Sequence, residues 1–288
     1  MTRSSTLHCS VAVAFLLSCA RPSLAQDANA TSAHNDTATT QKFDDDALIP
    51  AEPDFTLIAL PTALRLPLHG SAFRVTHRFL RPLNDGDFGD LTSDFFGLDD
   101  GAQIGLEYRF GIIPNGQIGI HRNSDKTIEF FAQYGLFRQD HPFPLEIAII
   151  ATTQAADNFK DAKTPSLGAI VSRRVGKVAA FYVEPIWVNN SNPLPKEVVD
   201  HNDTFMIGLG TRIRIRPTIY IVAEASPRLA GYRPGSTYGS FAIEKHIGGH
   251  QFQLNFSDSF ATTMGQIAVG GPSPTNWYLG FNISRKFF

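Results

Sequence analysis

Hydrophobic and polar residues alternate one by one between Gly101 and Gln139. In the first part of this stretch, apolar residues at every second position stand between polar or glycine residues: Ile104, Leu106, Tyr108, Phe110 and Ile112. A period of two places the two sets on opposite faces of a β-strand and excludes a helix. The alternation resumes after residues 113–116 and again from residue 127, so three strands joined by tight turns are predicted.

The same alternation along the chain predicts twelve strands, at residues 73–82, 102–113, 116–123, 127–138, 144–154, 165–175, 178–188, 204–215, 218–227, 237–247, 250–259 and 276–287. Many of these strands have ten or more residues. That is longer than the usual five or six residues of a strand and close to the roughly nine to eleven that a tilted strand needs to cross a bilayer.

The connections between these strands alternate in length. Short turns are expected at residues 113–116, 140–143, 175–177, 216–217 and 248–249, and longer loops at 83–100, 155–164, 189–203, 228–236 and 259–275, with 123–126 as a short exception. Short turns on one side and long loops on the other are typical of a bacterial outer-membrane barrel with both termini in the periplasm. The predicted fold is all-β, a single transmembrane antiparallel up-and-down β-barrel of about twelve strands.

The two faces of each strand differ in polarity. One face carries Leu, Ile, Phe and Ala and is expected to contact lipid. The alternate positions are expected to line the lumen, and those with charged or amide side chains are Glu107, Arg109, Glu129, Gln133, Glu146, Glu184, Arg212, Arg214, Glu224, Glu244, Gln253 and Asn255. Because a charge inside a narrow barrel is costly when it is unpaired, we expect these charges to pair with one another.

The N-terminal part has the features of an exported protein. Residues 1–25 are interpreted as a signal peptide cleaved after Ala25, because a basic start and a short apolar run precede a small-x-small motif. Residues 26–54 are interpreted as a disordered periplasmic linker and 55–288 as the barrel domain. Both cysteines lie within the signal, so disulfides are not expected, although the sequence before Cys19 also resembles a lipobox, in which case Cys19 would be lipidated.

Residues 55–68 are apolar but interrupted by Pro61 and Pro67. They are predicted to form a short element inside the barrel or beneath its mouth. The formal net charge of −2 is too small to indicate nucleic acid as a partner.

The candidate chemistry of the chain is sparse. The acidic loop 84–90 carries three aspartates beside glycines, which is compatible with a hard cation but lacks the spacing of an EF-hand. The histidines show no HExxH spacing, and no GxSxG motif occurs. We therefore predict no catalytic residue, no metal site and no cofactor, and we interpret the protein as a non-enzyme.

The last predicted strand, residues 276–288, places aromatic and aliphatic residues in one phase and ends in two phenylalanines. It resembles the C-terminal signal that is read by the barrel-assembly machinery of outer membranes. A larger resemblance rests on an ordered set of short segments: Thr76-His77-Arg78-Phe79, Phe95-Phe96-Gly97-Leu98-Asp99, Gly105-Leu106-Glu107-Tyr108, Gly119-Ile120-His121-Arg122-Asn123 and Lys126-Thr127-Ile128-Glu129-Phe130-Phe131. In these segments the chain, over about residues 55–288, resembles the membrane bound beta barrel domain family, DUF5777. The resemblance implies an outer-membrane barrel and no established activity.

Three functions remain open from the sequence. The first is a channel for small polar solutes, which would be narrow because eight strands are filled by side chains and roughly sixteen to eighteen leave an aqueous channel. The second is a closed barrel that serves as an anchor or docking platform. A lipid-modifying enzyme of the outer membrane is a weaker third. A soluble secreted β-sandwich would present the same alternation, but the long strands and alternating loop lengths argue against it.

Overall fold

The computed structural model describes residues 51–139, 143–192, 194 and 202–288. The predicted signal peptide, Cys19 and most of the predicted linker lie outside the described residues. The strands are β1 (Ser71–Pro82), β2 (Ala102–Ile113), β3 (Gly116–Asn123), β4 (Ile128–Phe137), β5 (Glu146–Ala155), β6 (Thr164–Val175), β7 (Ala179–Asn189), β8 (Asp203–Arg216), β9 (Ile219–Ser226), β10 (Arg228–Gly231), β11 (Tyr238–Ile247), β12 (His250–Ser257) and β13 (Tyr278–Phe287).

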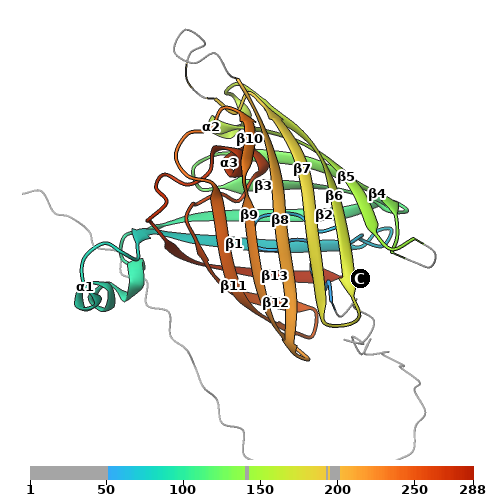
Figure 1. The fold of residues 1–288 in the computed structure, drawn as a ribbon, viewed down its shortest axis with the longest axis horizontal. Helices are drawn as coiled ribbons and strands as arrows, with labels where there is room; N and C mark the ends of the chain where they lie inside the picture. The colour runs from blue at the N-terminus through green and yellow to red at the C-terminus, as the bar shows by residue number, and fades with distance from the viewer. Residues whose placement is uncertain (1–50, 140–142, 193, 195–201) are drawn as a thin grey trace, which may run out of the picture. The chain divides into compact units, whose positions relative to one another are not determined.

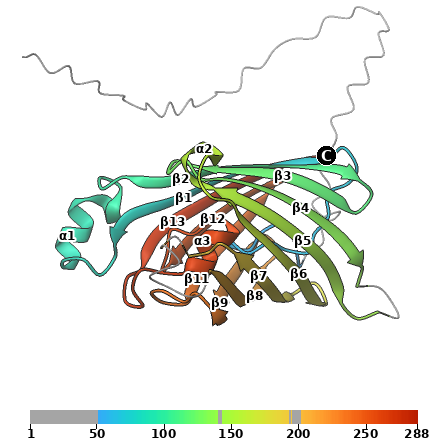
Figure 2. The same cartoon turned by 90° about the horizontal axis from the view of Figure 1, so that it is seen from above.

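These strands form one closed antiparallel barrel (Figures 1 and 2). Sequential strands pair with each other, and β1 pairs with β2 on one side and with β13 on the other, which joins the two ends of the chain. The predicted all-β up-and-down barrel of about twelve strands is therefore confirmed. In the described barrel every strand except the short β10 pairs on both sides, which avoids the unpaired edges that would be costly in lipid.

The ninth predicted strand, residues 218–227, is observed as β9, and a short strand that was not predicted, β10, follows it. Both β9 and β10 pair with β8, and they are separated by Pro227. Proline has no N–H to donate to a neighbouring strand, although its carbonyl accepts a hydrogen bond from the N–H of Ile207 at 3.0 Å. Residues 228–231, which were expected to be loop, thus extend the wall as a short separate strand.

On the strands the exposed side chains are apolar and the buried ones are polar, as in a membrane barrel. On β2, Ile104 and Leu106 are 41% and 50% exposed, whereas Glu107 and Arg109 between the outward positions are each 4% exposed. The outward apolar residues of neighbouring strands lie side by side in register, as Ile221, Ile243 and Leu254 do. Contact with lipid requires apolar side chains on the outer face of the barrel, and the polar side chains then face its interior.

Helices occur only in the long loops of the described chain: α1 (Phe88–Ser93), η2 (Phe95–Gly97), α2 (Ala156–Phe159) and α3 (Met264–Val269). Figure 1 places them at the end of the barrel opposite the C-terminus. None of the described helices is long and apolar enough to cross a membrane. We call this end the long-loop end and the opposite one the short-turn end.

Candidate functional site

The chain before β1 enters the lumen from the short-turn end. Every residue from 51 to 63 is buried, and Leu57, Ile58 and Leu60 are completely so. The segment turns back on itself, because the N–H of Thr62 donates to the carbonyl of Phe55 at 2.9 Å and that of Leu57 donates to Leu60 at 2.8 Å. We call residues 54–62 the inserted hairpin. Of the two places expected for the proline-interrupted apolar stretch, the structure shows the inside of the barrel.

The turn of the inserted hairpin rests on one carboxylate of the wall. The N–H groups of Ile58, Ala59 and Leu60 donate to the two carboxylate oxygens of Glu224 at 3.0, 2.8 and 3.1 Å. The hydroxyl of Tyr238 donates to the same carboxylate at 2.5 Å. Hydrogen bonds to an ionised acceptor are stronger than neutral ones, so Glu224 is the main anchor of the turn.

Donors of the wall meet the carbonyls of the same segment. Arg212 donates to the carbonyl of Thr56 at 2.6 Å, and Gln253 to that of Leu57 at 2.8 Å. Further donors bind the carbonyls of Ile58 and Thr62, and they are Arg74 at 3.2 Å, Asn282 at 2.9 Å and Gln133 at 2.9 Å. The wall therefore recognises the backbone of the hairpin more than its side chains.

The buried charges of the wall form three groups. Glu107 contacts Arg74 at 2.5 Å and Arg109. Glu244 pairs with Arg212 at 3.0 Å and accepts hydrogen bonds from Gln251 and Gln253. Near the short-turn end, Glu146 pairs with Arg174 at 2.8 Å and with Arg65 of the inserted segment at 3.5 Å.

The residues expected to line the lumen all lie on the inward face of the wall. Eleven are buried, namely Glu107, Arg109, Glu129, Gln133, Glu146, Glu184, Arg212, Glu224, Glu244, Gln253 and Asn255, while Arg214 is partly exposed and donates to the carbonyl of Pro217. Glu129 accepts the N–H of Met264 at 2.9 Å. The carboxylate of Glu184 has no hydrogen-bond partner among the described residues. The eleven buried side chains are covered by other parts of the chain, so they do not border an open pore in this structure.

The contacts of the hairpin include residues that the sequence analysis did not predict. Asn282, Ser284 and Tyr238 are buried, inward-facing residues of β13 and β11, and Ser284 donates to the carboxylate of Asp54 at 2.6 Å. The inward phase of residues 276–288 was the available signal, since Asn282 alternates with Phe281 and Ile283.

A second insertion enters from the long-loop end. The loop between β12 and β13 carries α3, whose residues Met264, Ile267 and Ala268 are buried in one apolar cluster with Leu57, Ile58 and Leu60 of the hairpin. The N–H of Gly265 donates to Gln154 at 3.0 Å. The hairpin and α3 thus meet inside the barrel.

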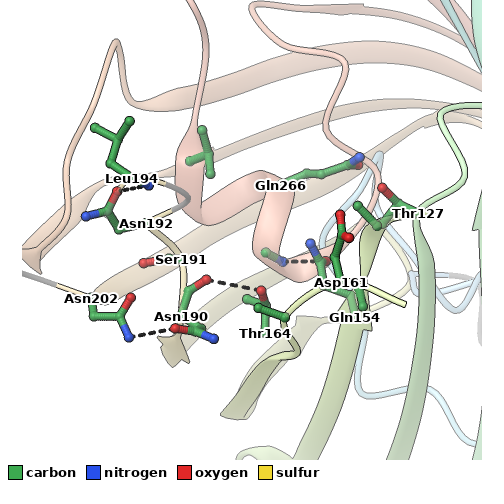
Figure 3. A pocket seen from close by; sticks show the side chains of 15 residues that line it. Thr127, Gln154, Asp161, Thr164, Asn190, Ser191, Asn192, Leu194, Asn202 and Gln266 are labelled. Atoms are coloured by element: carbon green, nitrogen blue, oxygen red, sulfur yellow. Dashed lines mark hydrogen bonds between the residues drawn. The ribbon is translucent and has the colours of Figure 1, made fainter. Parts of the chain in front are cut away.

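Little free volume remains beside the hairpin. Two spaces against it measure about 10 and 20 Å³. A cavity of that size holds about one water molecule. By contrast, the long-loop end is hollowed on both sides of α3 by cavities of about 640 and 440 Å³, and Gln266 and Val269 line both. Figure 3 shows the larger one. The protein is therefore closed in its middle and open at its long-loop mouth.

One titratable group of the inserted segment is perturbed. Glu52 precedes the hairpin near the short-turn end, and burial, with a smaller contribution from the Glu146 carboxylate, raises the pKa of Glu52 to about 7. Arg174, whose guanidinium is 3.4 Å from Glu52, opposes this shift. Burial outweighs the ion pair because Glu146 shares the same arginine.

The acidic loop is explained by its own fold. Asp87 and Asp90 cap the start of α1 reciprocally, each carboxylate accepting the other's N–H at 3.0 Å. Asp94 pairs with Arg81. Among the described residues, no three histidine, cysteine or acidic side chains come together as a metal site would need.

Solved structures of similar fold are porins. The NanC porin is 9% identical, with a TM-score of 0.52 over 75% of this chain and all of that chain (100%). The KdgM porin, solved in complex with disordered oligogalacturonate, is 7% identical, with a TM-score of 0.47 over 76% of this chain and 99% of that one. The NanC comparison shows a shared fold.

No curated protein matches this chain. A family model does match it, over residues 55–287, which is the entire barrel with the inserted hairpin. The chain belongs to the membrane bound beta barrel domain family, DUF5777.

Proposed function

We propose that the protein is a bacterial outer-membrane barrel that passes small polar solutes, and that the inserted hairpin is the gate of this passage. In this proposal the short-turn end and both termini face the periplasm, and the long loops face outward. No catalytic residue, metal or cofactor is assigned to it.

The observation that carries the proposal is the way the wall holds the hairpin. Side chains such as Glu224, Arg212 and Gln253 bind its backbone amides and carbonyls. When the hairpin leaves, water replaces it at these groups without a loss of their hydrogen bonds, so a polar lining remains for a solute to follow.

The topology of the hairpin also permits it to leave. Its N-terminal side lies near Arg174 at the end of β6, and its C-terminal side leads to His69, whose N–H donates to Gly111 near the end of β2. Both sides therefore return to the short-turn end. Among the described residues the hairpin pairs with no strand of the wall, so withdrawal breaks no strand pairing.

A disulfide lock tests the gate. A Cβ atom built on Gly208 of β8 lies 3.1 Å from Cδ1 of Leu60, so the two side chains meet, and a Leu60→Cys, Gly208→Cys double variant is the pair chosen for the lock. We expect the oxidised variant to show no conductance in planar bilayers and the reduced one to conduct. Each single variant, which cannot form the bond, is the control.

The second candidate function is a closed barrel that serves as an anchor. It is favoured by the apolar cluster in which Leu57 and Leu60 pack against Ile150, Ile186 and Met206 of the wall. If neither the reduced double variant nor a variant lacking residues 54–62 conducts at any voltage, the channel is excluded and the closed barrel stands.

The proposal includes two kinds of partner. Outer-membrane lipid covers the outward apolar side chains, and the barrel-assembly machinery reads the C-terminal segment 276–288. In support of the second, Phe287 is 45% exposed on the outer face at the end of β13, where a partner can reach it.

A further inference from the structure

The larger cavity at the long-loop end has a volume of about 640 Å³, within the roughly 300–1,000 Å³ of small-molecule sites. It lies between the loop that carries α2, the end of β7 and one side of α3 (Figure 3). The residues that line it come from segments far apart in the sequence. It is therefore a feature of the folded barrel that can accept a ligand of small-molecule size.

The rim of this cavity is held in shape by hydrogen bonds among its loops. The amide of Asn190 accepts from the side chain of Asn202 at 2.6 Å and donates to the carbonyl of Lys163 at 3.0 Å. The hydroxyl of Thr164 donates to the carbonyl of Asn190 at 3.1 Å. A cavity that is formed before its ligand arrives does not spend binding energy on ordering loops.

The polar groups of the lining are mostly uncharged. They are amides and hydroxyls, among them Gln154, Asn202 and Gln266, and of the described lining residues only Asp161 is ionisable. The neighbouring ammonium of Lys163 donates to the carbonyls of Phe159 and Asp161 at 2.7 and 2.9 Å. Side-chain amides both donate and accept, which suits a ligand whose groups do the same.

Two hydrogen-bonding groups of the lining are not used within the described part of the chain. Gln154 accepts the N–H of Gly265 through its carbonyl oxygen, while its amide nitrogen has no hydrogen-bond partner among the described residues. Asn202 donates to Asn190, and its carbonyl oxygen likewise has no partner in the described part of the chain. Between these groups the lining consists of small apolar side chains such as Ala156 and Ala162, which suit a ligand's C–H groups.

We propose that this cavity binds an uncharged polyhydroxylated solute, a mono- or disaccharide unit, at the outer mouth of the barrel. The hydroxyls of such a ligand match the amides, and its C–H faces match the alanines. The inference rests on the proposed function, for which it names the class of solute, but binding at equilibrium does not require passage.

Binding to the purified full chain in detergent tests the proposal by calorimetry and ligand-observed NMR. The probes are sucrose, glucuronate and glucosamine, which are neutral, anionic and cationic. We expect saturable sucrose binding in the millimolar range. Absence of saturable sucrose binding, or saturable binding of a charged probe alone, overturns the proposal.

Matched variants locate the site. Ala162 is an exposed lining residue, so Ala162→Trp fills the cavity without disturbing the buried packing, and Asn202→Leu removes a polar group instead of adding bulk. Each is expected to weaken sucrose binding at least tenfold. Thr275→Trp, at an exposed loop position that lines neither cavity, is the control. A sucrose affinity that is unchanged from the wild type in both Ala162→Trp and Asn202→Leu overturns the proposal. If the protein binds sucrose but does not conduct, the channel function is excluded and the binding cavity stands. If it conducts but does not bind sucrose, the binding cavity is excluded and the channel function stands.

Discussion

At the scale of single residues, Glu224 shows how a wall side chain can hold an inserted segment without a matching side chain. Its two oxygens accept three consecutive backbone N–H groups of the turn. A tight turn leaves its amides without partners of their own, and burying them unpaired is costly. The carboxylate therefore stabilises both the conformation of the turn and its position in the lumen.

Replacing this carboxylate by an amide is expected to loosen the hairpin. In Glu224→Gln one of the two oxygens becomes an NH₂ group, which faces N–H donors instead of accepting from them. We expect a loss of about 1.4 kcal/mol in hairpin docking, equivalent to roughly tenfold. The measurement is the rate at which a water-soluble maleimide labels an Ala59→Cys reporter, since no cysteine occurs between residues 51 and 288.

Glu184→Gln is the matched control for this measurement. Glu184 is equally buried on the same wall, but its carboxylate has no hydrogen-bond partner among the described residues. The control variant should label no faster than the reporter alone. Equal labelling rates in both variants would show that Glu224 does not hold the turn.

Glu52 is expected to make hairpin docking depend on pH. Its pKa is about 7 in the docked state against an ordinary value of 4.5, so the docked state binds more protons between these two values. The free energy of hairpin docking is therefore most favourable below about pH 4.5, becomes less favourable as the pH rises toward 7, and is constant above that. Its total change is on the order of 3 kcal/mol. The charged and titratable groups that face Glu52 are Glu146, Arg174, Tyr182 and Arg212.

The measurement is the labelling rate of the Ala59→Cys reporter with Glu52 present, divided by its rate in the Glu52→Gln variant. This ratio reports on Glu52 alone, because the pH dependence of the thiol is the same in both and cancels. The ratio should rise between pH 5 and pH 7.5 and then stay constant. A ratio that does not change with pH would contradict a proton bound at Glu52.

At the scale of elements, β8 makes room for the hairpin by omitting side chains. A Cβ atom on Gly210 would collide with Leu57, and one on Gly208 would lie 3.1 Å from Leu60. In the sequence these glycines belong to the polar face of the strand, which is expected to line the lumen. Alternation identifies which side of a strand faces inward, but it does not tell whether the space there holds water or another segment of the same chain.

Filling that space is expected to displace the hairpin. In Gly210→Leu the new side chain takes the place of Leu57, whose Cδ1 atom would collide with a Cβ atom at this position. We expect faster labelling of Ala59→Cys and a higher conductance than that of the wild type. Thr211→Leu on the outward face of the same strand is the control. A barrel that remains closed in Gly210→Leu would argue that the hairpin can dock elsewhere in the lumen.

At the scale of the whole molecule, the barrel itself was predictable, and its contents were predictable only in part, because the sequence left two places open for residues 55–68 and did not indicate α3. Strand positions follow from a period of two, and closure follows from the alternating loop lengths, so β2 and β3 begin and end at the predicted residues. The hairpin and α3 are short and irregular, and they are placed by contacts with residues such as Glu224 and Glu129, which lie more than a hundred positions away. Such contacts leave no local periodicity in the sequence.

The outer surface carries a prediction about depth in the membrane. Ile243 lies in the middle of β11, with Ile221 and Leu254 on either side, and it is 58% exposed. Ile247 ends the same strand beside the turn and is 52% exposed. Arginine costs about 2–4 kcal/mol at the midplane of a bilayer and about 0–1 kcal/mol near its surface. Ile243→Arg should therefore lose several times more free energy of unfolding than Ile247→Arg, measured by urea titration in phospholipid vesicles. Because the two positions are almost equally exposed in the fold, equal losses would mean that water rather than hydrocarbon surrounds this strand.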